Sequence, residues 1–157
     1  MDLFAMLAEV YSGRETRIET RNGIDYFVIV NPFWNENIRI CSDDIIFFFS
    51  FQHAHFDFCH NMDENIELLI EYIDRFLHKR EVAVEFFIEG ETDFGGSICL
   101  DDIDLSSGKS ALKSFSGEYG YKSFSKRAEK LACRCSIRSW NDAGNMDIDF
   151  VVHSKQT

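Results

Sequence analysis

The chain has 157 residues, of which 45% are hydrophobic and 27% charged, and these proportions are typical of a folded domain rather than a disordered chain. Its length is sufficient for one globular domain, spanning residues 1–157, with a core of its own. The net charge of −11 at pH 7 opposes binding to duplex nucleic acid and favours a basic protein partner.

Three features of the sequence bear on its location in the cell. The first ten residues carry two acids and no basic residue, which predicts a helix rather than a secretory signal. No apolar run approaches the ~20 residues that span a bilayer. The five cysteines are odd in number and form no Cys-x-x-Cys pair, which favours reduced thiols. We therefore expect a cytoplasmic protein that does not contact a membrane.

The charges are unevenly distributed along the chain. Residues 1–108 contain 22 acidic and 7 basic residues, whereas residues 109–138 contain 8 basic and 2 acidic residues. Aromatic residues are interleaved with the basic ones in the second segment, a combination found in proteins that bind single-stranded nucleic acid. The acidic remainder opposes that function, so we expect no nucleic-acid partner and interpret the segment as an ordinary basic helix.

The first half of the chain predicts a short helix followed by a meander of four antiparallel strands. Asn22-Gly23 predicts a type I′ hairpin turn, because both central positions of that turn require a positive φ. The strand that follows this turn is apolar on both faces, which is typical of a central strand. The expected elements are a helix over 2–12 and strands over 14–21, 24–30, 37–41 and 45–60.

The second half predicts a long amphipathic helix, further strands and a basic helix. The helix over 61–80 has apolar residues at helical spacing, acids in its first turns and bases at its end. The other expected elements are strands over 81–89 and 97–100 with a turn over 90–96 between them, a basic helix over 123–131, and a closing hairpin of 133–140 with 146–152. This order of elements predicts an α+β fold with a mainly antiparallel sheet and helices packed on one face.

Phenylalanine and histidine are concentrated in residues 47–60. One apolar face is formed by odd positions up to Phe51 and by even positions from Ala54 onwards. Because side chains alternate along a strand, one face can stay apolar through this change only if a residue is inserted. We therefore predict a single strand with a β-bulge near Gln52.

The same segment contains a candidate metal site. His53 and His55 form a His-x-His pair, which on one strand separates the two Cα atoms by roughly 7 Å. Imidazole, thiolate and carboxylate groups are suitable zinc ligands, and three of them with a water molecule form an open site. The predicted ligands are drawn from His53, His55, Asp57 and Cys59, and a metal-bound water would be the nucleophile of a hydrolase. The alternative is a polar face that holds no cofactor.

The motif His53-Ala54-His55-Phe56-Asp57 follows an aromatic strand and precedes an amphipathic helix. This arrangement resembles one found in small uncharacterised bacterial proteins, some of which are similar to immunity proteins of polymorphic toxin systems. The resemblance covers the motif and its neighbouring elements. It implies a single-domain cytoplasmic protein that binds a cognate toxin, and it assigns no residue to the binding surface.

We therefore favour a non-catalytic protein that binds a basic partner protein through acidic residues. The candidate binding residues lie on the long helix and on the strand after it: Glu64, Glu67, Glu71, Asp74, Glu81, Glu85 and Glu89. Two alternatives remain open. One is a metal-dependent enzyme, a hydrolase at the His-x-His strand, and the other is an accessory subunit that forms a homodimer through a sheet edge.

Overall fold

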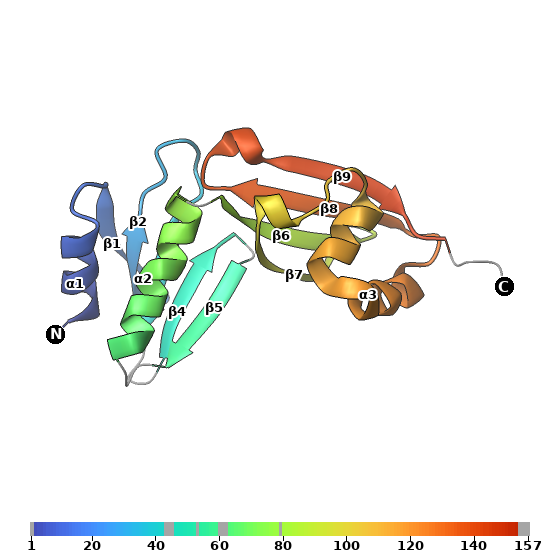
Figure 1. The fold of residues 1–157 in the computed structure, drawn as a ribbon. Helices are drawn as coiled ribbons and strands as arrows, with labels where there is room; N and C mark the ends of the chain where they lie inside the picture. The colour runs from blue at the N-terminus through green and yellow to red at the C-terminus, as the bar shows by residue number, and fades with distance from the viewer. Residues whose placement is uncertain (1, 43–45, 53, 60–62, 79, 154–157) are drawn as a thin grey trace. The chain divides into compact units, whose positions relative to one another are not determined.

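The structure is a computed structural model that describes residues 2–42, 46–52, 54–59, 63–78 and 80–153. It divides into two compact units, Met1–Arg75 and Phe76–Thr157. Each unit contains one antiparallel sheet together with helices (Figure 1). The predicted α+β fold with a mainly antiparallel sheet is therefore confirmed.

The first unit is a meander of five strands. Each strand pairs with the next one along the chain, which gives the sheet order β1-β2-β3-β4-β5. Helix α1 precedes the sheet and α2 follows it, and the last residues of α2 belong to the second unit. The bounds are α1 Leu3–Val10, β1 Thr16–Arg21, β2 Ile24–Ile29, β3 Ile38–Ser42, β4 Ile46–Phe51, β5 Ala54–Cys59 and α2 Asp63–His78.

The predicted hairpin at Asn22-Gly23 is confirmed. Both residues have positive φ, 53° and 79°, and Arg21 pairs with Ile24 across the turn. Asparagine and glycine tolerate this backbone conformation better than other residues, so the turn fixes the register of β1 against β2.

The core of the first unit lies against strand β2. Phe27, Val28 and Ile29 are at most 2% exposed, so both faces of this strand are covered, as its sequence predicted. Helix α1 contributes Phe4, whose ring centre lies 6.0 Å from that of Phe27, and Leu7, which is fully buried.

The prediction of one long strand with a bulge near Gln52 is wrong. Gln52 has a positive φ of 52°, and Phe51 pairs with Ala54, so the chain reverses direction between these two residues. The antiparallel register then sets Phe49 opposite Phe56. The change of parity in the sequence therefore marks the reversal from β4 to β5, and no inserted residue is needed.

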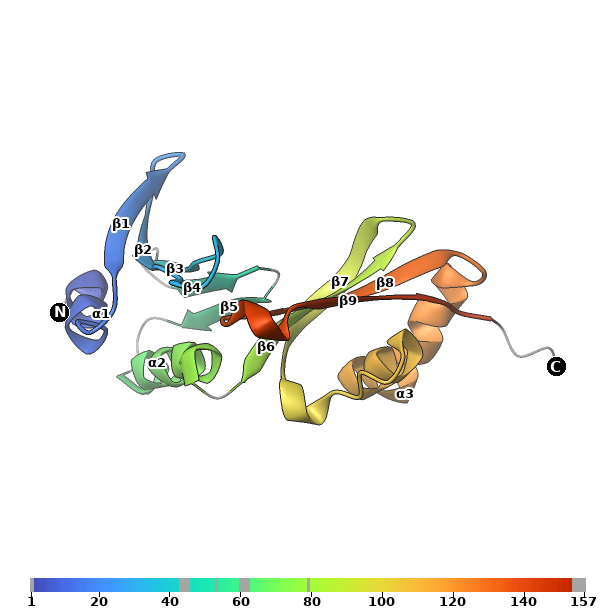
Figure 2. The ribbon, with the colours of Figure 1, turned by 90° about the horizontal axis from the view of Figure 1, so that it is seen from above.

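The second unit is a four-stranded antiparallel sheet in the order β7-β6-β8-β9, and helix α3 covers one of its faces (Figure 2). The predicted closing hairpin is confirmed as β8 paired with β9. Two short 3₁₀ helices, Leu100–Asp102 and Asp142–Gly144, connect the main elements. The bounds are β6 Glu81–Ile88, β7 Glu91–Cys99, α3 Gly108–Ala128, β8 Ala132–Ser139 and β9 Met146–Val151.

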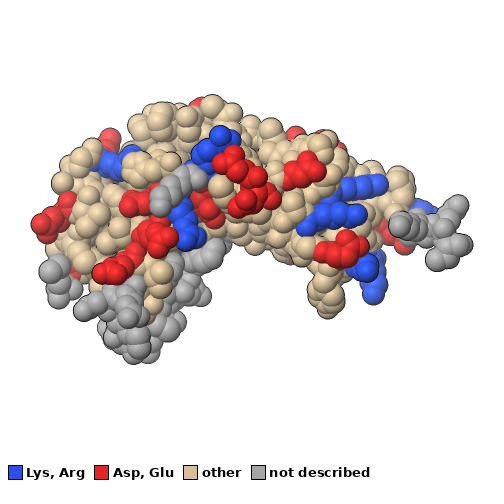
Figure 3. All heavy atoms as spheres, in the orientation of Figure 1, with Lys and Arg blue, Asp and Glu red and all other residues tan. Residues whose placement is uncertain are grey.

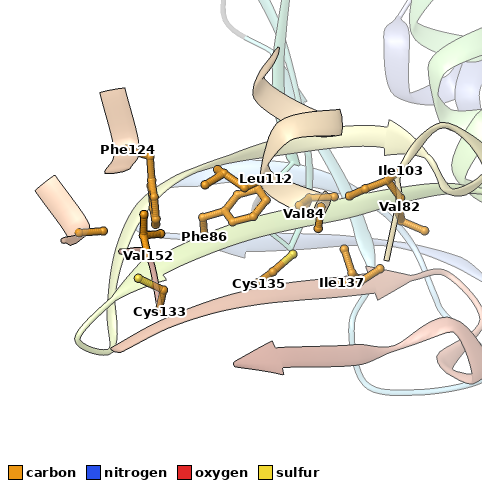
Figure 4. Packing of buried hydrophobic residues seen from close by; sticks show 12 residues of the cluster. Val82, Val84, Phe86, Ile103, Leu112, Phe124, Cys133, Cys135, Ile137 and Val152 are labelled. Carbon is orange, nitrogen blue, oxygen red and sulfur yellow. The ribbon is translucent and has the colours of Figure 1, made fainter. Parts of the chain in front are cut away.

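An aromatic cluster holds α3 against this sheet. The ring centre of Phe86 on β6 lies 5.0 Å from that of Phe94, 5.7 Å from that of Phe115 and 6.2 Å from that of Phe124. Figure 4 shows Leu112 of α3 beside Phe86, and both are fully buried. Aromatic pairs at these separations attract each other beyond the effect of the area that they bury, so the cluster fixes the position of the helix.

The turn predicted over 90–96 is also wrong, because strand β7 already begins at Glu91. The chain reverses at Glu89 and Gly90, whose φ values are 50° and 81°. Gly95, which suggested a turn, lies inside the strand. A Cβ atom at this position would lie 2.6 Å from a carbonyl oxygen of β6, so glycine is required there by the close approach of the two strands.

Helix α3 is longer than the helix predicted over 123–131. Ser107 caps it by accepting a hydrogen bond of 3.1 Å from a backbone N–H of the first turn. Gly117 interrupts it with a φ of 69°, and the helix bends there (Figure 2). At the bend a Cβ atom on Gly120 would lie 2.5 Å from the Cβ of Ser116, so a second glycine is needed for the close approach. These glycines obscured the helical pattern in the sequence.

Candidate functional site

The exposed side of α2 carries acidic residues around one apolar side chain. Glu67 and Glu71 are exposed, and Leu68 between them is 50% exposed. Arg75, one turn after Glu71, forms an ion pair of 2.9 Å with it. Acidic side chains gather over this helix in Figure 3. Glu64 belongs to the first turn of α2, where the structure describes the backbone alone.

Asp74 connects α2 to α1. The hydroxyl group of Tyr11 donates a hydrogen bond of 3.1 Å to the Asp74 carboxylate. Burial of the Tyr11 side chain raises its pKa well above the ordinary value, and the neighbouring carboxylate raises it further. This predicted binding residue therefore has a structural role between two helices.

The three acids predicted on the strand over 81–89 accept hydrogen bonds within the second unit, and Glu89 lies just after the end of β6. Glu81 accepts one of 2.8 Å from the hydroxyl group of Ser97. Glu85 is 1% exposed and accepts one from Thr92, so the expectation that it is a surface carboxylate is wrong. Glu89 is exposed, and it accepts a hydrogen bond of 2.8 Å from a backbone N–H at the start of β8. These carboxylates support the strand pairing of the sheet.

The predicted metal ligands fall on strand β5 and on the residue before it. His53 lies outside the described residues, and for His55, Asp57 and Cys59 the structure describes the backbone alone. Among the side chains that the structure does describe, no group of three or more His, Cys, Asp or Glu residues is placed to hold a metal ion. The zinc site and the hydrolase activity that depends on it therefore remain predictions.

Two cysteines of β8 are core residues. Cys133 is 4% exposed and Cys135 is fully buried. Burial raises the pKa of the Cys135 thiol to about 12 and also raises the pKa of Cys133. Because the thiolate is the reactive form, these two thiols are poor nucleophiles at neutral pH.

Glu19 on β1 lies among three arginines. Its carboxylate lies 2.5 Å from the guanidinium of Arg17, 3.0 Å from that of Arg21 and 3.5 Å from that of Arg39. Arg39 also pairs with Glu36 at 3.5 Å. The hydrogen bond from Arg17 is the main cause that lowers the pKa of Glu19. These arginines of the first unit are therefore engaged with acids of β1 and of the loop before β3.

A pocket of about 550 Å³ that the sequence did not predict lies along the bent helix α3. Residues from both halves of the helix line it. The parallel bridge between Glu129 and Val152 brings the segment after β9 beside the end of the helix, so that His153 also contributes. Its principal lining residues are Lys113, Tyr119, Tyr121, Lys122, Lys126 and His153.

The pocket lining combines cations with aromatic rings. The ammonium group of Lys113 lies 4.6 Å from the ring centre of Tyr121, which is a cation–π contact. Lys122 lies 4.0 Å from the carboxylate of Glu118, and Tyr119 is 88% exposed. Basic side chains gather over α3 in Figure 3. The signal in the sequence was the interleaving of lysines with aromatic residues, and the bend that brings them together was not visible in it.

Every helix that the structure describes is too short or too polar to cross a membrane. Comparison of the chain with protein-family models, curated proteins and solved structures gave no match. A functional assignment therefore depends on the chemistry of the surfaces of the two units.

Proposed function

We propose that this protein binds a basic partner protein through α2, without catalysis, in the manner of an immunity-type inhibitor. The observation that supports this most strongly is the charge of the first unit, which contains 14 acidic and five basic residues, a net charge of −9. A surface of one sign steers a partner of the opposite sign and raises the association rate.

The contact region, called here the α2 acidic face, consists of Glu67, Leu68 and Glu71. Carboxylates lie on either side of the half-exposed Leu68, so this surface has an apolar centre and a charged rim, as protein–protein interfaces do. Leu68 would lose water in the complex, while the carboxylates would meet cationic side chains of the partner. Glu71 is additionally oriented by its ion pair with Arg75.

Glu67 and Glu71 are preferred over the other predicted acids because of their surroundings. The hydrogen bonds that Asp74, Glu81 and Glu85 accept are partly buried, so substitution there would change stability together with binding, whereas the hydrogen bond from Arg75 to Glu71 is exposed. The resemblance to immunity-like proteins supports a toxin as the basic partner. Inhibition would then follow from steric occlusion of the toxin surface that α2 covers.

The test compares two variants that change the net charge equally. Glu67→Lys/Glu71→Lys reverses two charges on the α2 acidic face, and Glu9→Lys/Glu15→Lys reverses two exposed charges elsewhere in the first unit. Proteins retained from a cell lysate by the immobilised wild type and by each variant are identified by mass spectrometry. A basic protein that the first variant loses and the control retains is then purified for kinetics.

Stopped-flow association of that purified protein decides the proposal. For Glu67→Lys/Glu71→Lys we expect an association rate constant at least about tenfold lower at low salt, with a weaker dependence on salt, because electrostatic steering is lost. The control variant should associate within about twofold of the wild type. An unchanged rate constant in Glu67→Lys/Glu71→Lys, or retention of the same proteins by both variants, would overturn the proposal.

A further inference from the structure

Helix α3 is a basic element in an acidic protein. It contains five basic residues and a single acid, Glu118. Arg127 forms an ion pair of 2.6 Å with Asp93, whereas the three lysines Lys113, Lys122 and Lys126 line the pocket. Like charges gathered around a hollow focus the field and raise the local concentration of anions.

The bend at Gly117 is what brings these lysines to one pocket. Lys113 precedes the bend, and Lys122 and Lys126 follow it. Lys122 comes nine positions after Lys113, which would separate the two residues by about 13.5 Å along a straight helix, too far for both to contact one small anion. Because the helix changes direction between them, both side chains line the same hollow.

Two tyrosines supply flat apolar surface to the same pocket. The Tyr121 ring lies under the Lys113 ammonium group, which holds that cation at the pocket. The Tyr119 ring is 88% exposed, and an exposed aromatic ring is a platform on which another planar ring stacks. The volume of about 550 Å³ lies in the range of small-molecule sites rather than of protein grooves.

We propose that this pocket binds a small phosphorylated molecule with a planar aromatic ring, of the mononucleotide class. The three lysines and Glu118 give the lining a net charge of +2, which matches the charge of about −1.5 to −2 on a phosphate monoester at pH 7. The phosphate group contacts Lys122 and Lys126, and the ring stacks on Tyr119. A long nucleic-acid strand is disfavoured because the protein carries a net charge of −11.

This inference is independent of the proposed partner protein. The pocket belongs to the second unit and uses none of the carboxylates of the α2 acidic face. Loss of nucleotide binding and loss of partner binding are therefore expected from different substitutions.

The probe is adenosine 5′-monophosphate, titrated into the full-length protein and followed by isothermal calorimetry. We expect saturable binding with one site per chain. Lys126→Glu should weaken it by at least about tenfold, because a charged contact to the phosphate becomes repulsive. Tyr119→Ala should weaken it by about fivefold or more through loss of stacking. Lys109→Glu reverses a charge on the same helix outside the pocket, and it should stay within about twofold of the wild type.

Three related ligands complete the test: inorganic phosphate, adenosine and a single-stranded oligodeoxyadenylate. Absence of saturable binding of the monophosphate would overturn the proposal, as would equal affinity in Lys126→Glu and Lys109→Glu. If inorganic phosphate bound as tightly as the monophosphate, the proposed contact between the ligand ring and Tyr119 would be wrong. If the oligonucleotide bound more tightly than the monophosphate, the pocket would be a site for single-stranded nucleic acid and the proposal of a mononucleotide would be wrong. Lys126 and Tyr119 are exposed, so their variants should fold, and near-ultraviolet circular dichroism verifies this for each.

Discussion

Individual glutamates in this protein differ in function because their neighbours differ. Glu19 and Glu67 are both glutamates on regular elements, but Glu19 is 17% exposed among three guanidinium groups, whereas Glu67 is exposed on α2. Glu85 is a third case, since it is buried and accepts a hydrogen bond from Thr92. Charge counting alone treats the three as equal, and their surroundings decide whether each one stabilises a sheet or meets a partner.

Glu19 should contribute to the pH dependence of stability. The hydrogen bond from Arg17 lowers its pKa below the ordinary value of 4.5, so the folded state favours the charged carboxylate. Its contribution is therefore fully present above pH 4.5 and is lost as the pH falls through the lower pKa of the folded state. We expect Glu19→Gln to lower the free energy of unfolding at pH 7 by up to about 1 kcal/mol. Below pH 4.5 the variant should lose less stability than the wild type.

Urea unfolding between neutral and acidic pH measures this difference. Glu15→Gln, at an exposed position just before β1, is the matched control and should follow the wild-type curve. The explanation for Glu19 would be wrong if the difference in stability between wild type and Glu19→Gln were the same at neutral and at acidic pH.

At the scale of the element, α3 depends on one backbone position. Gly117 has a φ of 69° and a ψ of −178°, a backbone conformation that is essentially restricted to glycine and in which a side chain costs about 1–3 kcal/mol. We expect Gly117→Ala to lower the free energy of unfolding by roughly that amount, since a Cβ atom there meets no other atom and strain is the only change. Gly13→Ala is the control, because the space beside it is also open but its φ is not in the left-handed region.

Thermal unfolding of both variants tests the conformation of the bend. Gly13→Ala should leave the midpoint unchanged or raise it slightly. If Gly117→Ala were as stable as the wild type, the helix would accept alanine without strain and the bend would not require glycine.

The elements that the sequence predicted are those with a local cause. The Asn22-Gly23 turn requires only its own two residues, and α2 follows from apolar residues at helical spacing. The reversal at Gln52 has neither glycine nor asparagine next to it, so only the change of parity indicated it, and an inserted residue explained that change equally well. Gly95 contributed to the wrong prediction of a turn over 90–96, because glycine is needed there for the close approach of a neighbouring strand and not for a turn.

The candidate sites also differ in whether they depend on local sequence or on residues far apart in the chain. The exposure of Glu67 and Glu71 followed from their place on an amphipathic helix. The pocket along α3 required the bend at Gly117 and the return of the chain to His153, which lie far apart in the sequence. Lysines and tyrosines were visible in the composition, but only the fold brings them to one hollow.

At the scale of the whole molecule, the two units differ in charge. The first has a net charge of −9, and the second, with 13 acidic and 11 basic residues, has a net charge of −2. Net charge of one sign destabilises a compact state by self-repulsion, whereas exposed ion pairs stabilise it only weakly. The first effect should exceed the second in this protein, because the acidic excess is large and the ion pairs lie near the surface.

Salt should therefore stabilise the protein at neutral pH. Raising the ionic strength from about 0.01 M to about 0.1 M shortens the screening length from about 30 Å to about 10 Å, which weakens repulsion between distant carboxylates more than attraction within a contact pair. We expect the midpoint of thermal unfolding to rise over this range at pH 7. The rise should shrink near pH 4.8, where the net charge approaches zero. A fall at pH 7 would mean instead that ion pairs such as Arg134–Asp149, at 2.7 Å, outweigh the acidic excess.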